Sequence, residues 1–513
     1  MKCYQWVALS LVALSGCGAQ APSSDPVQKA PQSESISKKA GSDAEITEQI
    51  GKALIEHNLG SSGITIYFKK SVAVLSGEVL SDDERKAAVK ATASVPGVQS
   101  VMNELRLAQA KTEQEKLAED QKTLVAQQSN RGQQPTLEEP TADGHNWLKR
   151  DELEQGWVRL FDGQTLFGWK ANSDLNWAVE DGVISADTGK PGLLCTTTRF
   201  ADYELRCDYK VAAGGNSGIF LRTPFNPTDP GGDCYELNMC DTHPVFGTAS
   251  LVKRAKPETP VIGDDAWHSF HVRVEGPRVV VTFDGKQVLE YTDATEKPLK
   301  TGHIGLQMNG GKIEFRNVYL KPLGTQPLFD GKSLDGWREV AGSKSQFTVQ
   351  DGTIHVKDGR GFLETERTAG NFVLQFEAIT NGDKLNSGIF FRAMPGTEKA
   401  PSHGYEFQIQ SGFKNGDRTQ PDDHGTGAIF KRVSARRVIS SDRKWFTAML
   451  VADGPHLTTW IDGVQVVDWT DERPENENPR EGRRLKPGHF SLQGHDPTTD
   501  LAFRKLKLAD TPE

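Results

Sequence analysis

The sequence predicts a mainly β protein, with two β-sandwiches or jelly rolls in tandem and one small α/β domain ahead of them. The tandem is indicated by motifs that occur twice in the same order, such as "NSGIFLR" at 216–222 and "NSGIFFR" at 386–392. The β class is indicated by short alternating runs in each copy, separated by Gly, Asp, Asn and Pro.

Shared motifs align the two copies over their whole length. "LFDGQTLFGW" begins at 160 and "LFDGKSLDGW" at 328, an offset of 328 − 160 = 168, whereas "GHIGLQ" at 302 and "GHFSLQ" at 488 differ by 488 − 302 = 186. Because the offset only grows along the chain, we infer short insertions in the second copy without any change in motif order. We assign residues 151–323 to the first sandwich and 324–513 to the second.

The amino terminus is that expected of an exported lipoprotein. "WVALSLVAL" at 6–14 is apolar and too short to span a bilayer, and "LSGC" at 14–17 resembles a bacterial lipobox. We therefore expect a signal peptide at 1–17 and lipidation of Cys17, the alternative being an ordinary signal peptide. Gly18 favours an outer-membrane anchor that faces the periplasm. Residues 18–42, rich in Ser, Pro and Gln, are then a disordered tether.

Residues 43–107 are predicted to form a small domain in the order αββαβ. Two helical stretches flank two strand patterns, and Ser81 or Asp82 can cap the second helix. With "VAVLSGEV" and "VPGVQSVMNEL" this order resembles the BON domain, which implies association with a membrane or an envelope partner. The domain carries no nucleophile, base or metal-ligand cluster, so no chemistry is assigned to it. Residues 108–150 follow as a polar linker.

Composition excludes one class of partner and leaves one question open. The net charge of −9 and the lack of a basic stripe argue against nucleic-acid binding. An oxidising compartment would permit disulfides among the four cysteines of the first sandwich, but the sequence does not choose a pairing. These are Cys195, Cys207, Cys234 and Cys240.

The alternation of the repeated strands predicts one polar outer face in each copy. Ile389 and Phe391 share the core side of their strand, whereas Arg392 falls on the other side. The outward set is Arg392, Glu406, Gln408, Lys431, Gln493 and His495 in the second copy, and Arg222, Glu236, Asn238, Lys253, Gln307 and Asn309 in the first. An ordinary solvated face has no fixed order of residue types, but both copies keep this order, which predicts a functional groove.

The two copies differ at one titratable position of this face. His495 in the second copy stands where the first copy has Asn309. Histidine exchanges a proton near neutral pH and asparagine does not. We therefore expect catalysis in the second copy and sugar binding without turnover in the first.

Taken together, the motifs resemble those of one enzyme family. "LFDG..L.GW", "NSGI.FR", "YE.Q", "GTGAI", "DG..V" and "GH..LQ" are similar to the 3-keto-disaccharide hydrolase family, also described as 3-keto-glucoside 1,2-lyase and 3-keto-2-hydroxy-glucal hydratase. The resemblance covers about 157–322 and 325–509. It implies a concanavalin-like jelly roll, an exported setting and oxidised glycosides as substrates.

The predicted face fits this chemistry better than ordinary glycoside hydrolysis. Hydrolysis commonly uses two carboxylates, but "YEFQIQ" has one acid followed by amides. A 3-keto group acidifies the hydrogen on C2, so one base and one cation near the enolate suffice for elimination of the aglycone, and water adds afterwards. The predicted roles are His495, preferred, or Glu406 as base; Lys431 or Arg392 at the oxyanion; Gln408, Gln493 and Asn386 as sugar ligands; and Arg222, Glu236, Asn238, Lys253 and Gln307 as binding residues in the first copy.

Two alternatives stay open at this level. No cofactor is certain, but a divalent metal ion could polarise the ketone, with His403, Glu406, His424 and His495 as the candidate ligands. The other reading makes both sandwiches non-catalytic carbohydrate-binding modules that the BON domain docks to the envelope.

Overall fold

The computed structural model describes residues 42–57, 59, 63–79, 81–107, 145–263 and 265–512. The predicted signal peptide, Cys17, nearly all of the tether and most of the linker lie outside the described residues. Within them, no helix is long and apolar enough to cross a membrane. The described chain divides into an amino-terminal unit and a larger unit that contains both sandwiches.

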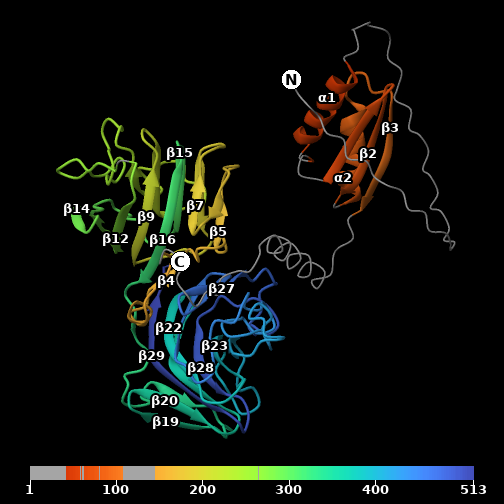
Figure 1. The fold of residues 1–513 in the computed structure, drawn as a ribbon. Coiled ribbons are helices and arrows are strands. Elements are labelled where there is room, and N and C mark those ends of the chain that lie inside the picture. The colour runs from red at the N-terminus through yellow and green to blue at the C-terminus, as the bar shows by residue number, and fades with distance from the viewer. Residues whose placement is uncertain are drawn as a thin grey trace, which may run out of the picture. The chain divides into compact units, whose positions relative to one another are not determined.

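The amino-terminal unit has the predicted order αββαβ (Figure 1). Its elements are α1 (Asp43–Glu56), β1 (Gly63–Lys69), β2 (Val72–Val79), α2 (Asp82–Ala93) and β3 (Ser100–Leu107). β1 pairs antiparallel with β2, and β2 pairs parallel with β3. Ser81 caps α2, because its hydroxyl accepts a hydrogen bond of 3.1 Å from the backbone N–H of Glu84. Apolar residues of both helices and the sheet form one core.

The first sandwich packs a five-stranded sheet against an eight-stranded sheet. The five-stranded order is β11-β10-β15-β8-β5, and the larger sheet runs β14-β13-β12-β9-β16-β7-β6, with β4 beside β16. Its elements are α4 (Arg150–Glu154), β4 (Val158–Arg159), β5 (Trp169–Ala171), β6 (Ala178–Glu180), β7 (Val183–Ala186), β8 (Gly192–Thr196), β9 (Tyr203–Val211), β10 (Asn216–Thr223), β11 (Tyr235–Met239), β12 (His268–Glu275), β13 (Arg278–Phe283), β14 (Lys286–Thr292), β15 (His303–Gly310) and β16 (Ile313–Pro322).

The second sandwich repeats this topology strand for strand. Its five-stranded order is β24-β23-β28-β21-β18, and its larger sheet runs β19-β20-β29-β22-β25-β26-β27, with β17 beside β29. The strands are β17 (Gln326–Pro327), β18 (Trp337–Glu339), β19 (Gln346–Gln350), β20 (Thr353–Lys357), β21 (Gly361–Ala369), β22 (Phe372–Thr380), β23 (Ser387–Ala393), β24 (Tyr405–Ile409), β25 (Phe446–Asp453), β26 (His456–Ile461), β27 (Val464–Thr470), β28 (Gly488–Gly494) and β29 (Asp500–Asp510). The predicted class, tandem β-sandwiches behind a small α/β domain, is confirmed.

The two sandwiches share a buried interface. Val373, Met449, Val451 and Trp460 project from the larger sheet of the second sandwich and join the apolar core cluster of the first. Trp460 donates a hydrogen bond of 3.1 Å to the carbonyl of Arg159. We infer that the pair of sandwiches behaves as one body.

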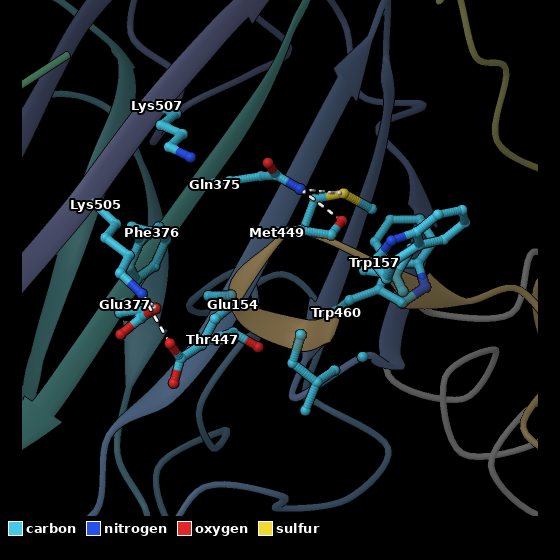
Figure 2. Close-up of a pocket in the computed structure, with 15 residues that line it drawn as sticks. Glu154, Trp157, Gln375, Phe376, Glu377, Thr447, Met449, Trp460, Lys505 and Lys507 are labelled. Atoms are coloured by element: carbon cyan, nitrogen blue, oxygen red, sulfur yellow. Dashed lines mark hydrogen bonds and ion pairs between the residues drawn. The ribbon is translucent and has the colours of Figure 1, made fainter. Parts of the chain in front are cut away.

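A small crevice remains beside this interface, lined by α4 and by strands of the second sandwich (Figure 2). Lys505 reaches the carboxylates of Glu154 and Glu377 there, and Gln375 donates to the carbonyl of Gly156 at 3.0 Å. Its volume of about 30 Å³ holds one or two water molecules and no sugar ring. The crevice is therefore part of the interface packing.

All four cysteines of the first sandwich are buried and free. Burial raises the pKa of the Cys195 and Cys234 thiols to about 12, which keeps them protonated. None of the pairings that the sequence left open forms.

Candidate functional site

The outer face of each five-stranded sheet carries the predicted glutamate and amide side chains. In the second sandwich, strands β24, β23, β28 and β21 are neighbours, so their outward side chains share one face. Phe390 pairs with Glu406 on one side and with Ser491 on the other, and Gly388 pairs with Gln408. The core side of the same strands carries Tyr405, Phe407, Phe490 and Leu492.

Glu406 is the central acid of this face. Its side chain is 7% exposed and lies over Gly388, where a Cβ would meet its Oε1 at 3.1 Å. Burial raises the pKa of Glu406 to about 7; the positive charges of Arg480 and Lys431 oppose that rise, and Asp423 adds to it. A carboxylate with this pKa can accept a proton near neutral pH.

Three oxygen atoms beside Glu406 are buried without a hydrogen-bond partner among the described residues. They are Oε1 of Gln408, Oγ of Ser491 and Oε1 of Gln493. An unpaired buried acceptor costs free energy, so hydroxyl groups of a ligand that donate to these atoms would recover it. The face is thus prepared for a polyhydroxylated molecule.

A loop carboxylate that sequence reasoning missed orders this corner. Asp423 accepts hydrogen bonds from the amide nitrogens of Asn386, at 2.5 Å, and Gln408, at 3.1 Å. Asn386 and Gln408 are thereby held in place with the oxygen of Gln408 left free. Nothing in the "DDHG" run at 422–425 marks Asp423 as a partner of Asn386, which precedes β23, or of Gln408 on β24.

The two predicted arginines do not lie on the open face, and that part of the prediction is wrong. Arg392 is 0% exposed and donates to the carbonyls of Gly370, Gly454 and Arg484 and to Asn371. A β-bulge between Phe390 and Ala393 and a φ of +45° at Arg392 break the alternation on which the prediction rested.

The first sandwich contains the same arrangement. Arg222 is 1% exposed, with a φ of +50°, and donates to the carbonyls of Ala201, Gly276 and Leu299 and to Asp202. This geometry requires glycine at position 302, because a Cβ there would lie 2.3 Å from the backbone carbonyl carbon of Arg222. The repeated arginine is therefore a structural tether of three loops in each copy.

His495 lies apart from Glu406. It follows the end of β28, is 41% exposed, and places Nδ1 2.8 Å from Asp496. Glu406 and Ser491 share one cross-strand row, and His495 is four residues beyond Ser491. Two strand spacings of about 4.8 Å and four residues at about 3.3 Å put the two residues roughly 16 Å apart. They cannot act on the same atom of a substrate.

The remaining predicted residues of the second copy surround Glu406 more loosely. Lys431 is exposed on a turn with a φ of +58°, and its Nζ lies 5.2 Å from the ring centroid of Phe430. His424 contacts Ser434 through Nδ1 at 2.9 Å, and burial lowers its pKa. Among the described residues, no group of three or more His, Cys, Asp or Glu could hold a metal ion, so the four candidate ligands are not brought together.

The first copy presents the same face with different charge. Glu236 is 7% exposed, and its pKa is raised by burial, against which a hydrogen bond from Gln307 acts. Asn238 donates to the carbonyl of Phe246 at 2.5 Å, and Lys253 is paired with Asp229 at 2.8 Å. Asn309 is exposed at its strand end.

A cavity of about 700 Å³ opens beside this face of the first sandwich. Phe220 and Leu193 supply apolar surface, and Ser173 and Gln307 each bring an oxygen that has no partner among the described residues. Its size and its mixture of apolar floor and free acceptors suit a carbohydrate.

Comparison with known proteins identifies the two sandwiches. The model of the 3-keto-alpha-glucoside-1,2-lyase-like domain matches residues 156–321 and again 324–509, more than half of the chain. The chain belongs to this family. A BON domain matches residues 42–109, ahead of the two 3-keto-alpha-glucoside-1,2-lyase-like domains. The family resemblance seen in the sequence motifs is thereby confirmed.

Individual relatives agree at low identity. A 3-keto-disaccharide hydrolase from Bacteroides thetaiotaomicron is 27% identical over 231 residues, 33% of this chain and 79% of that protein. A Parabacteroides distasonis structure, provisionally described as a glycosyl hydrolase, is 24% identical over 35% of this chain and 99% of its own, with a TM-score of 0.31. The carbohydrate-binding module CBM66 from Bacillus subtilis is 17% identical over 30% of this chain and 95% of its own, with a TM-score of 0.24. On the family match over both sandwiches, the protein is a 3-keto-disaccharide hydrolase-like, carbohydrate-active protein.

Gly388 offers a test of how closely Glu406 is fitted to the face. In Gly388→Ala the new Cβ would lie 2.9 Å from the carbonyl oxygen of Phe407 and 3.0 Å from Cγ of Glu406. We expect Glu406 to be displaced, with roughly tenfold loss of kcat/KM and about 1–3 kcal/mol loss of stability. The matched control is Gly310→Ala, at a strand glycine of the first sandwich, where a Cβ would meet no atom within 4 Å and φ lies outside the left-handed region. Equal kinetics of the two variants would contradict the fit.

Proposed function

We propose that the second sandwich cleaves 3-keto-glycosides and that Glu406 is the base. The observation that carries this proposal is the buried Glu406 carboxylate, with its pKa raised to about 7, beside three unpartnered oxygen acceptors. Elimination from a 3-keto sugar needs one base rather than the two carboxylates of ordinary glycoside hydrolysis.

The reaction would proceed in two stages. The C2–H bond breaks, its proton moves to the Glu406 carboxylate, and the electron pair forms an enolate with the 3-keto group. When the C3 carbonyl re-forms, a C1–C2 double bond forms, and the glycosidic oxygen leaves C1 and takes the proton that Glu406 received, which regenerates the carboxylate. Water then adds across that double bond, with its hydroxyl on C1 and a proton on C2, to give the free keto sugar.

The neighbours of Glu406 support each stage. The positive charge of Lys431 acts on Glu406 across the site and would stabilise the enolate that develops next to it. Gln408, Ser491 and Gln493 would accept hydrogen bonds from sugar hydroxyls. Glu406 thus takes the role that sequence reasoning assigned first to His495, because His495 lies roughly 16 Å away by strand geometry.

For the first sandwich we propose sugar binding without turnover. Lys253, the counterpart of Lys431, is neutralised by Asp229, and Gln307 donates to Glu236. The open cavity beside them remains suited to a carbohydrate. The same division was expected from Asn309 and His495, but it now rests on the partners of Lys253 and Glu236 rather than on that difference.

We further propose that the protein is a lipoprotein of the cell envelope. It would be attached to the outer membrane through Cys17 and would face the periplasm. The lipobox-like "LSGC" and the BON domain, from which the sequence led us to expect an envelope association, support this location. Mass spectrometry of the mature amino terminus would test it, since an unmodified or uncleaved Cys17 contradicts the proposal.

The activity is tested by incubating the full-length protein with 3-keto-trehalose or 3-keto-sucrose and measuring release of the aglycone sugar. We expect release from the 3-keto substrates and none from trehalose or sucrose, because only the ketone acidifies C2. The assay is repeated after chelation and with added divalent ions, which reports any metal requirement. No release under any of these conditions would contradict the enzymatic function and leave the carbohydrate-binding reading.

A further inference from the structure

Two arginines stand over the floor of the second site. The guanidinium of Arg480 lies 5.4 Å from the ring centroid of Phe390, and that of Arg360 lies 5.9 Å from the ring centroid of Phe362. The two rings contact each other edge to face at 5.7 Å and are almost fully buried. Both arginines are exposed, so they border the site from the solvent side.

Neither arginine forms an ion pair within the described residues, although the charge of Arg480 acts on Glu406. Other cations of this sandwich are paired: Arg338 with Glu364, Lys384 with Asp422, and Arg443 with Asp383. Within the described part of the chain, no carboxylate forms such a pair with Arg360 or Arg480; the side chain of Arg480 donates only to the hydroxyl of Ser402, at 3.2 Å.

Stacking on an aromatic ring leaves a guanidinium ready for an anion. The ring holds the plane of the guanidinium through a cation–π contact, while the N–H groups at its edge stay free. Such an edge matches the oxygens of a carboxylate, sulfate or phosphate. Phe390 lies directly opposite Glu406 in the sheet. The guanidinium of Arg480, which lies over Phe390, is therefore close enough to Glu406 for one substrate to contact both residues.

The first sandwich lacks both arginines. Since Gly192 corresponds to Gly361, Pro191 occupies the position of Arg360. Arg480 belongs to the segment 472–487, which is sixteen residues long, whereas its counterpart 294–301 has eight. The positive border is therefore specific to the second copy, which carries Arg480 in its longer segment and Arg360 in place of a proline.

We propose that the second site takes acidic glycosides, in which a carboxylate, sulfate or phosphate group lies over Phe362 and Phe390 and is held by Arg360 and Arg480. The inference rests on the proposed function for the identity of the reaction, but not for binding. The acidic group sits away from C2, on the side of the substrate that extends from Glu406 toward β21.

The test compares 3-keto-glucosides of four phenols, each with one para substituent: carboxylate, sulfonate, phosphonate or neutral carboxamide. With the full-length protein we expect kcat/KM for at least one acidic glycoside to exceed that of the carboxamide by about tenfold or more, through KM. Which acid is preferred distinguishes the three sources of the anion. Arg360→Gln and Arg480→Gln should each reduce the ratio to about twofold, and Arg480→Lys should restore it only in part. Arg278→Gln, an exposed arginine of the first sandwich, should keep the ratio.

Calorimetry with the corresponding unoxidised glucosides separates this inference from the proposed reaction. Tighter binding of the acidic glucosides that is lost in Arg360→Gln and Arg480→Gln supports the inference, even if no substrate is turned over. Equal binding and equal kcat/KM of acidic and neutral compounds would overturn it, even if turnover is fast. Circular dichroism of each variant confirms that the sandwich is intact before the ratios are compared.

Discussion

Replacing Glu406 by Gln is expected to lower kcat for 3-keto-glycosides by roughly 10²–10⁴-fold, the usual contribution of a positioned general base. Gln keeps the size of the side chain over Gly388 but cannot take the C2 proton. Sugar binding should persist, because Gln408 and Gln493 are unchanged. Glu236→Gln is the matched change in the first copy: a loss of similar size there would move the reaction to the first sandwich.

The pH dependence provides an independent readout of the same residue. A base must be unprotonated, so kcat/KM should fall about tenfold per pH unit below the pKa of Glu406, near 7, and level off above it. Burial raises that pKa above the ordinary 4.5, which means the folded protein binds this proton more tightly than the unfolded chain. Stability is therefore lost as pH rises from about 4.5 to about 7, and Glu406→Gln should be the more stable protein at pH 8. A flat activity profile across this range would exclude Glu406 as the base.

Residue alternation predicted the correct face of each side chain wherever the strands are regular. It placed Glu406, Gln408 and Gln493 on the outer face and Phe407 and Leu492 in the core, and the structure agrees. The tandem sandwiches were predictable for the same reason, since repeated motifs and alternating runs are local properties of the chain. The Asp-Gly pairs at 284–285 and 462–463 are local signals of the same kind, because Asp284 and Asp462 adopt the positive φ that hairpin turns need.

Residue alternation predicted the wrong face where the backbone departs from regular strand geometry. Arg392 and Lys431 have φ values of +45° and +58°, which cannot be predicted from the residue type. Because the strand is irregular at Arg392, alternation assigned this residue to the wrong side. Asp423 and Arg480 come from loops that approach the sheet only in the tertiary structure. The one sequence signal for Arg480 was the growth of the offset from 461 − 283 = 178 to 488 − 302 = 186, which marks the insertion but not its contact with Phe390.

Replacing Arg392 by Ala is expected to lower the free energy of unfolding by about 3–5 kcal/mol, because several buried acceptors would lose their donor at about 1–3 kcal/mol each. The side chain is fully buried, and it alone joins the carbonyls of Gly370, Gly454 and Arg484, which belong to three separate loops. Without it those acceptors lose their donors in a place that water reaches poorly. Denaturant unfolding followed by tryptophan fluorescence measures the shift in midpoint.

This change separates the structural role of Arg392 from the catalytic role that the sequence suggested. If Arg392 met the substrate, Arg392→Ala would keep its unfolding midpoint and lose turnover, the opposite of the expected result. Arg222→Ala should be destabilised in the same way, because Arg222 tethers the equivalent loops of the first sandwich and pairs with Asp202. Arg278→Ala, at an exposed position, should stay within about 0.5 kcal/mol of the parent protein. Equal destabilisation at positions 222 and 392, with none at 278, would show that the two arginines have the same structural role. The motif that begins with "NSGIF" would then end on arginine in both copies because this residue holds three loops together.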